Sequence, residues 1–311
     1  MMSVKNRVLT SSFTLIMRNI PKLFKKLQFL GKIDIKWINV LGTRHTVGRI
    51  GYGKSTMMNY LLVQKIVHCS DRDLEEISGY DHSTFSKARK RFKRDHIYEK
   101  FFSHLIKLAI RKGVLQTEKI LIDSSFVKTY SGKKEEGSSY WIKGIVKKGY
   151  GFKLHALTDE QGIPLALIIT TGSRHDCPVA IPLLESFRTL RLTTKYVLAD
   201  KGYDDLDLVH YIVTQLGAKA GIPMRVKQGK KTKRTNKQGY QDFLIKSKGR
   251  WLRKSVYNKR SQIERSFSKL KNKFNLGKER MRGMNNFIRN CYLSCICYLL
   301  TFLYAHGISS F

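Results

Sequence analysis

Hydrophobic positions recur at helical spacing in the part of the chain between residues 55 and 112. The first stretch has an apolar face made of Met57, Met58, Tyr60, Leu61, Leu62, Ile66 and Val67. Three more helices are expected, at about residues 71–77, 81–92 and 98–112. Ser70 followed by Asp73 is an N-terminal capping pattern, while Gly79 and Gly113 mark turns. The pattern predicts an all-helical region.

From residue 119 onward, short apolar runs between turn residues predict β-strands. Strands are expected at 119–123, over 151–172 as a hairpin of two strands, at 194–200 and at 218–224. Helices are expected over 178–191 and 205–216. This alternation predicts an α/β fold in which helices pack on a mixed sheet. The uncharged stretch 291–305 is too short for a full bilayer span, so it predicts a buried packing helix and no membrane-spanning segment.

Charge separates this chain from an ordinary globular protein. It carries 59 Lys and Arg against 23 Asp and Glu, a formal net charge of +36. A folded chain this basic is expected to bind a polyanion, and nucleic acid is the first candidate. A basic membrane-surface protein and a ribosome-associated protein are the alternatives. Residues 219–256 form a basic segment that either tracks phosphates or is a solvated loop, and the basic residues 1–47 have no assigned role.

Two further features bear on location and cofactors. Five cysteines without a disulfide-framework spacing, and an N-terminus without a secretory signal, indicate a reducing, cytoplasmic setting. Residues 48–55, GRIGYGKS, match a phosphate-loop pattern that includes Lys54. The residues before it make a poor buried strand, so no nucleotide cofactor is expected.

A helix-turn-helix pattern lies within the helical region. The segment DRDLEEISGYDHSTFSKARKRF reads as two short helices joined by a turn at Gly79. The second helix is basic, and its DNA-binding candidates are Lys87, Arg89, Lys90 and Arg91. An ordinary helical hairpin with a solvated basic face is the alternative. We therefore expect a helical DNA-binding region over 48–115 and an α/β domain over 116–311.

Two aspartates each follow an apolar run that predicts a strand. Asp123 follows Ile120-Leu121-Ile122, and Asp200 follows Val197-Leu198-Ala199. If the strands are parallel neighbours, the two carboxylates meet at one edge of the sheet, where a divalent cation relieves their repulsion. Oxygen ligands favour Mg²⁺ or Mn²⁺. For either aspartate alone, a turn or a helix cap is the simpler explanation.

Four polar residues recur at helical spacing near residue 264. At roughly 100° per residue, Arg260, Glu264 and Lys271 lie at roughly 300°, 340° and 320° from Tyr257. All four therefore share one stripe of a helix. An exposed salt-bridge stripe is one interpretation. The other is a phosphodiester site, in which Glu264 completes the metal ligands while Tyr257, Arg260 and Lys271 hold phosphate oxygens.

The arrangement Tyr-x2-Arg-x3-Glu-x6-Lys resembles the signature of the DDE transposases encoded by prokaryotic insertion sequences. Similar stretches are LIDSSFVK, GYGFKLHALTDEQGIPLALIITTGSRHD, VLADKGYDD and the helical segment from Gly51. The resemblance covers the chain from about residue 48 to the C-terminal helix. It implies an RNase H-like core whose first and fourth strands carry Asp123 and Asp200 and whose last helix carries Glu264.

The resemblance also implies an activity and partners. The three carboxylates would hold two Mg²⁺ or Mn²⁺ ions for DNA cleavage and strand transfer. His175 and Asp176 match a His-Asp pair of the family and are expected to have a supporting role. Expected partners are the terminal inverted repeats of the element, the target DNA and a second copy of the chain in a homodimer. The alternative function is a non-catalytic, domesticated DNA-binding protein derived from a transposase.

Overall fold

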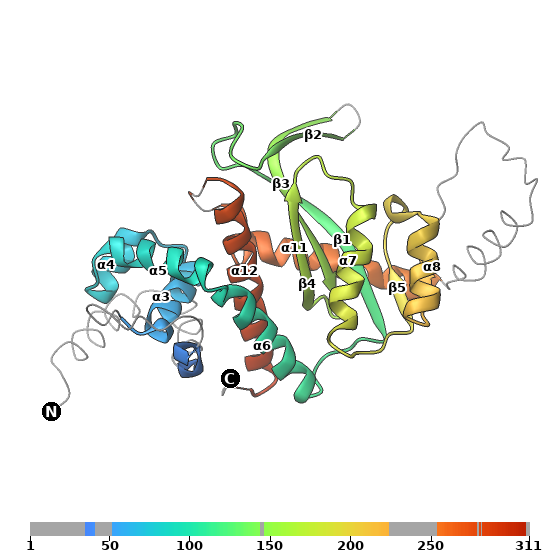
Figure 1. The fold of residues 1–311 in the computed structure, drawn as a ribbon, viewed down its shortest axis with the longest axis horizontal. Helices are drawn as coiled ribbons and strands as arrows, with labels where there is room; N and C mark the ends of the chain where they lie inside the picture. The colour runs from blue at the N-terminus through green and yellow to red at the C-terminus, as the bar shows by residue number, and fades with distance from the viewer. Residues whose placement is uncertain are drawn as a thin grey trace, which may run out of the picture. The chain divides into compact units, whose positions relative to one another are not determined.

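The computed structural model of the protein describes residues 35–40, 52–143, 146–223, 254–278, 280 and 282–308. They belong to two compact units, drawn in Figure 1. Unit 1 comprises residues 1–114, 272–275 and 289–311, and unit 2 comprises residues 115–271 and 276–288. Three segments discussed above lie outside the described residues, wholly or mostly: 1–47, the first four residues of the GRIGYGKS motif, and the basic segment 219–256.

The described part of unit 1 contains helices and no strand. Its N-terminal elements are η1 (Lys36–Val40), α3 (Lys54–Val67), α4 (Asp71–Ser78), α5 (His82–Arg94) and α6 (Ile97–Arg111). Ser70 and Asp73 form the expected capping box, in which each side chain accepts the other residue's backbone N–H. Gly79 ends α4 with a φ of 69°, and Asp81 caps α5. The predicted helices are confirmed within one or two residues at each end.

The C-terminal helix α12 (Met284–Ala305) begins in unit 2 and continues into unit 1. By length and composition it is the one helix in the described ranges that could cross a membrane, but 67% of its most apolar stretch is buried inside the structure. In unit 1, Ser294 donates to the carbonyl of Phe274, and the Tyr298 and Phe274 rings stack at 5.7 Å. The predicted packing helix is therefore confirmed.

Unit 2 is built on a mixed six-stranded sheet. The strands are β1 (Lys119–Lys128), β2 (Ser139–Lys143), β3 (Val146–Thr158), β4 (Pro164–Thr171), β5 (Tyr196–Leu198) and β6 (Lys219–Gly221). Their order is β2-β3-β1-β5-β6, and β4 also pairs with β3. The pairs β1–β3 and β3–β4 are antiparallel, whereas β1–β5 and β5–β6 are parallel. Without β2, this is the strand order of an RNase H-like core, so the predicted fold class is confirmed.

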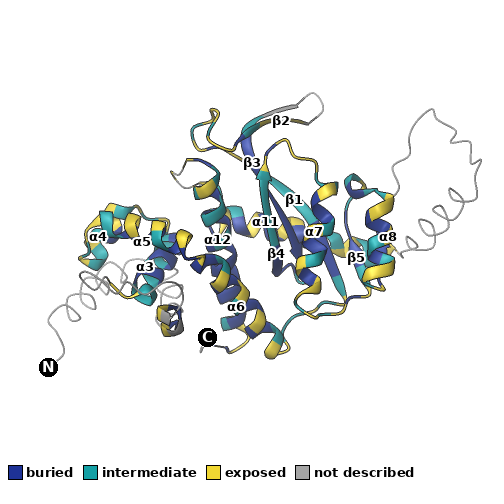
Figure 2. Cartoon of the chain, viewed as in Figure 1, coloured by how far each residue is buried: buried dark blue, intermediate teal, exposed yellow. Residues whose placement is uncertain are grey.

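Helices cover both faces of the sheet. They are α7 (Cys177–Arg188), η2 (Lys201–Tyr203), α8 (Leu206–Gln215), α10 (Lys254–Tyr257), η3 (Asn258–Arg260) and α11 (Ser261–Asn272). Figure 1 shows α7 in front of the strands and α11 behind them. Ile120, Ile122 and Val197 are fully buried. Figure 2 shows buried stretches both in the sheet and in the helices that cover it.

The structure differs from the sequence predictions in three places. The first strand does not end near Asp123, because β1 stays paired with β3 as far as Lys128 opposite Gly151. The strand β2 was not predicted, since its five residues lie in a polar, glycine-rich stretch. The glutamate helix is not one regular helix, because the 3₁₀ turn η3 separates α10 from α11.

Candidate active site

Asp123 lies on β1, and Asp200 lies just after β5, the parallel neighbour of β1. The last paired residues of β1 and β5 are Leu121 and Leu198, and each aspartate lies two residues further along. Asp200 caps η2, since its Oδ1 accepts the Gly202 N–H at 2.7 Å. Asp123 Oδ1 accepts the Ser124 N–H at 2.8 Å. The strand register thus brings the two predicted carboxylates to one edge of the sheet.

The environment of Asp123 carries an excess of negative charge. Burial, together with the nearby Asp200 and Glu264, raises the pKa of its carboxyl to about 6, against the opposing effects of the Ser124 N–H and Arg260. Carboxylates held this close disfavour one another's ionised form unless a cation joins them. The donor set consists of oxygen atoms, so the residues present fit a hard divalent cation such as Mg²⁺ or Mn²⁺.

Arg260 is the cation that the structure provides at these carboxylates. Its Nη2 lies 2.6 Å from Glu264 Oε1, and its Nη1 lies 3.6 Å from Asp123 Oδ2. The Glu264 side chain is 54% exposed, against 19% for Asp123. Within the described residues, the three predicted carboxylates do not gather to within 4.8 Å of one another, because Arg260 lies between two of them.

The two remaining residues of the predicted stripe have different surroundings. Tyr257 ends α10 close to Arg260, and burial raises the pKa of its hydroxyl, as do Asp200 and Asp123. Lys271 lies further along α11, where its Nζ donates to the carbonyl of Phe126 at 3.0 Å. Lys271 therefore attaches α11 to β1, and Tyr257 lies beside the aspartates.

The two residues of the predicted supporting pair, His175 and Asp176, have different surroundings. His175 is exposed, whereas Asp176 faces the sheet and accepts from Lys153 Nζ at 2.9 Å. His155 Nδ1 lies 3.6 Å from the same Asp176 oxygen. Lys153 and His155 were missed in the sequence, although two basic residues at alternating positions in an otherwise apolar strand are a signal that could have found them.

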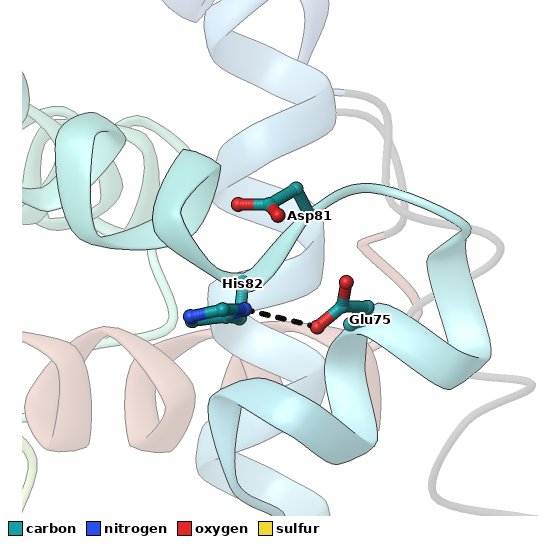
Figure 3. Close-up of side chains that lie close together, drawn as sticks. All are labelled: Glu75, Asp81 and His82. Atoms are coloured by element: carbon teal, nitrogen blue, oxygen red, sulfur yellow. Dashed lines mark hydrogen bonds and ion pairs between the residues drawn. The ribbon is translucent and has the colours of Figure 1, made fainter.

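A second group of metal-ligating side chains lies at the turn between α4 and α5. Glu75, Asp81 and His82 offer atoms within 4.8 Å of one another, as Figure 3 shows. Two local roles account for them. His82 Nδ1 pairs with Glu75 Oε2 at 3.0 Å, and Asp81 accepts the Ser83 N–H as the cap of α5.

The basic helix α5 has an exposed face and a buried face. Lys87 and Lys90 are exposed, and Arg91 is half-buried. An open groove of about 290 Å³ is lined by Tyr52, Met57, Thr84, Lys87, Ala88 and Arg91. The prediction that Arg89 contacts DNA is corrected by the structure. The Arg89 side chain is buried, and it donates to Asp71 Oδ2 at 2.7 Å and to Gln64 Oε1 at 2.6 Å.

An RNase H-like sheet with two aspartates at one edge and a glutamate on a neighbouring helix defines a class of protein, the nucleic-acid-cutting enzymes that use carboxylate-bound metals. Residues 115–300, more than half of the chain, match the family described as the transposase DDE domain. The chain belongs to this family, and it is a DDE-type DNA transposase. The alternative of a domesticated, non-catalytic DNA-binding protein is not favoured.

Similar proteins are transposases as well. A putative transposase for insertion sequence element IS6501 from Brucella ovis is 29% identical over 143 residues, which cover 46% of this chain and 93% of the relative. The piggyBac transposase in a synaptic complex with hairpin DNA has a TM-score of 0.48 at 13% identity, covering 94% of this chain and 77% of that chain. The Mos1 transposase in a paired-end complex has a TM-score of 0.24 at 10% identity, covering 72% and 80%.

Proposed function

We propose that this transposase cuts and joins DNA at the ends of a mobile element, with Asp123, Asp200 and Glu264 as its metal ligands. The observation that carries the proposal is that Asp123 and Asp200 follow the paired ends of β1 and β5 at one sheet edge, with Glu264 linked to Asp123 through Arg260. Two divalent ions at these carboxylates would activate the attacking water or DNA 3′-hydroxyl and stabilise the leaving oxygen.

The chain's own residues prepare this site. Burial and the neighbouring acids raise the pKa of the Asp123 carboxyl, so a bound divalent cation would stabilise its ionised form. Arg260 would leave Glu264 when metal binds, and its planar fork would then hold phosphate oxygens of the DNA backbone. Tyr257 lies beside Arg260, where its hydroxyl would reach the same backbone. Lys271 keeps α11 on β1 and would add a positive charge for the DNA.

Recognition of the element ends is assigned to α5 in unit 1. Lys87, Lys90 and Arg91 would contact phosphates or base edges, and Arg94 joins them on the same face. Arg89 is left out because it is buried. The DNA partners would be the terminal inverted repeats and the target site. A homodimer would hold two ends together in the cytoplasm, without a nucleotide cofactor.

The test is cleavage of the element's own ends with Mg²⁺ or Mn²⁺. Asp123→Asn, which keeps the size of the side chain, is expected to reduce cleavage at least a thousandfold, because the uncharged amide is a poor ligand for a hard cation. Binding of the ends in a gel-shift assay should remain near the wild-type level. Asp207→Asn, the same change at an exposed position of α8, is the control. Cleavage by Asp123→Asn at the wild-type rate would refute the assignment.

A further inference from the structure

The backbone pairing between β1 and β5 stops short of the catalytic carboxylates. The last pair is Leu121 with Leu198, so two residues on each strand separate the ladder from Asp123 and Asp200. A site of this kind needs its ligands held within a fraction of an ångström. Other contacts must therefore fix the spacing between the two strand ends.

Tyr203 is in the right place to fix this spacing. It belongs to the turn η2 that Asp200 caps, and its backbone N–H donates to the Asp200 carbonyl at 3.1 Å. Its side chain is only 1% exposed, and its hydroxyl lies within reach of the Ser124 side chain. Ser124 in turn donates its backbone N–H to Asp123 Oδ1 at 2.8 Å. Tyr203 thus connects the turn after β5 to the residue that holds Asp123.

A polar layer made of Lys153, His155 and Asp176 lies near the Tyr203 hydroxyl. Lys153 is the cation of this layer, with a side chain that is 5% exposed. Its Nζ donates to Asp176 Oδ1 at 2.9 Å and to the Arg174 carbonyl at 2.6 Å, and it lies 5.3 Å from the centroid of the Trp141 ring. A lysine buried this deeply is tolerated because several partners compensate its charge.

The layer reaches Tyr203 through Asp176. This residue precedes α7, and α7 packs against η2. Asp176 acts electrostatically on the Tyr203 hydroxyl, as do Asp123 and Asp200. The Tyr203 hydroxyl has no hydrogen bond of normal geometry to a described residue. Buried hydroxyl groups of folded proteins are mostly hydrogen-bonded, and the Ser124 side chain is a partner within reach of this one.

We infer that Tyr203 is a positioning residue for the metal ligands: its hydroxyl bridges to Ser124 and holds the ends of β1 and β5 at the separation that Asp123 and Asp200 require. The inference rests on the proposed metal-dependent function. Groups that orient metal ligands typically contribute 10- to 100-fold to metal affinity.

The experiment compares Tyr203→Phe with wild type. We expect Mn²⁺ binding without DNA, measured by calorimetry, to weaken about tenfold. The cleavage kcat should fall by a similar factor at unchanged KM for DNA. Tyr98→Phe is the matched control, because Tyr98 is a buried tyrosine of unit 1, 2% exposed, that lies outside the proposed metal site. Ser124→Ala tests the bridge, and Ser124→Ala with Tyr203→Phe should lose no more affinity than Tyr203→Phe alone.

The outcomes separate the inference from the proposed function. Wild-type protein that neither binds Mn²⁺ nor cuts DNA would refute the proposed function. Wild-type behaviour of Tyr203→Phe in both assays, with active wild type, would overturn only the positioning role. An equal loss in Tyr98→Phe, or a fall in thermal stability with unchanged Mn²⁺ affinity, would also overturn it, because a merely structural hydroxyl would give those results.

Discussion

Arg260 shows how a single side chain can serve two states of one site. Its guanidinium neutralises Glu264 and Asp123 in the described structure. A divalent cation at the same carboxylates would take over that role and leave the arginine without its acidic partner. Phosphate oxygens of bound DNA are the natural replacement, since the fork of a guanidinium matches them. Metal binding and DNA binding are therefore expected to favour each other through Arg260.

Arg260→Gln tests this exchange. The variant should bind Mn²⁺ more tightly than wild type in the absence of DNA, by about fivefold. A fivefold change in affinity corresponds to roughly 1 kcal/mol, which is the upper limit of what an ion pair with a largely exposed acid contributes. Its cleavage activity should nevertheless fall, because the phosphate contact is lost. Lys259→Gln, the same change of charge at the exposed neighbouring residue, is the control, and equal Mn²⁺ affinities of all three proteins would contradict the exchange.

His155 gives unit 2 a dependence on pH. Burial lowers the pKa of its imidazole to about 4, with Lys153 and Arg174 acting in the same direction and Asp176 opposing them. The folded protein therefore keeps His155 neutral at a pH where the unfolded chain, with a pKa near 6.5, takes up a proton. Its contribution to stability is fully present above about pH 6.5 and is lost as the pH falls toward 4.

His155→Gln removes this contribution from the pH profile. Urea unfolding at pH 7.5 and pH 5 gives the change in unfolding free energy between the two conditions. The decrease in unfolding free energy from pH 7.5 to pH 5 should be smaller in the variant than in wild type. The raised pKa values of Asp123 and Asp159 work in the opposite direction but are common to both proteins. His175→Gln, at an exposed site, should keep the wild-type profile, and an unchanged profile in His155→Gln would rule out the assignment.

At the scale of elements, α5 combines a structural face with a proposed DNA-binding face. Arg89 on the buried face ties three helices together through Gln64 of α3 and Asp71 of α4. Lys90, the next residue, points to solvent. A helix presents successive residues about 100° apart, so adjacent basic residues have unrelated roles.

Two neighbouring substitutions separate these roles. Arg89→Ala should lower the unfolding free energy by about 2–3 kcal/mol, since it leaves the partly buried carboxylate of Asp71 with Gln64 as a donor but without its cationic partner. Lys90→Ala should change it by less than about 0.5 kcal/mol but weaken binding of the element ends. Urea unfolding and gel-shift titration of both variants provide the comparison. If Arg89→Ala keeps the wild-type stability but binds the element ends more weakly, Arg89 contacts DNA and the structural role is refuted.

The elements that follow local rules could be predicted from the sequence. The capping pair Ser70 and Asp73 and the turn at Gly79 fixed the helices of unit 1, and the apolar runs before Asp123 and Asp200 located two core strands. The extension of β1 could not be predicted, because pairing with β3 carries it through polar Ser124 and Ser125. The burial of Arg89 could not be predicted either, because it depends on hydrogen-bond partners 18 and 25 residues away in the sequence.

For the molecule as a whole, the net charge of +36 predicts strong electrostatic binding to DNA of any sequence. The logarithm of the binding constant should fall linearly with the logarithm of salt concentration, by about 0.9 for each phosphate neutralised. Lys87→Ala and Lys90→Ala should each reduce this slope by about 1. Filter binding across a salt series measures it, and unchanged slopes would show that neither lysine contacts a phosphate.

The path of the chain through its two units has a consequence for the order of synthesis. The chain passes between the units after residues 114, 271, 275 and 288, so unit 1 contains segments that precede and follow unit 2 in the sequence. On the ribosome, unit 1 stays incomplete until unit 2 has emerged, and Lys65 of α3 finds its partner Asn290 only then. Prematurely terminated chains therefore lack a finished unit 1.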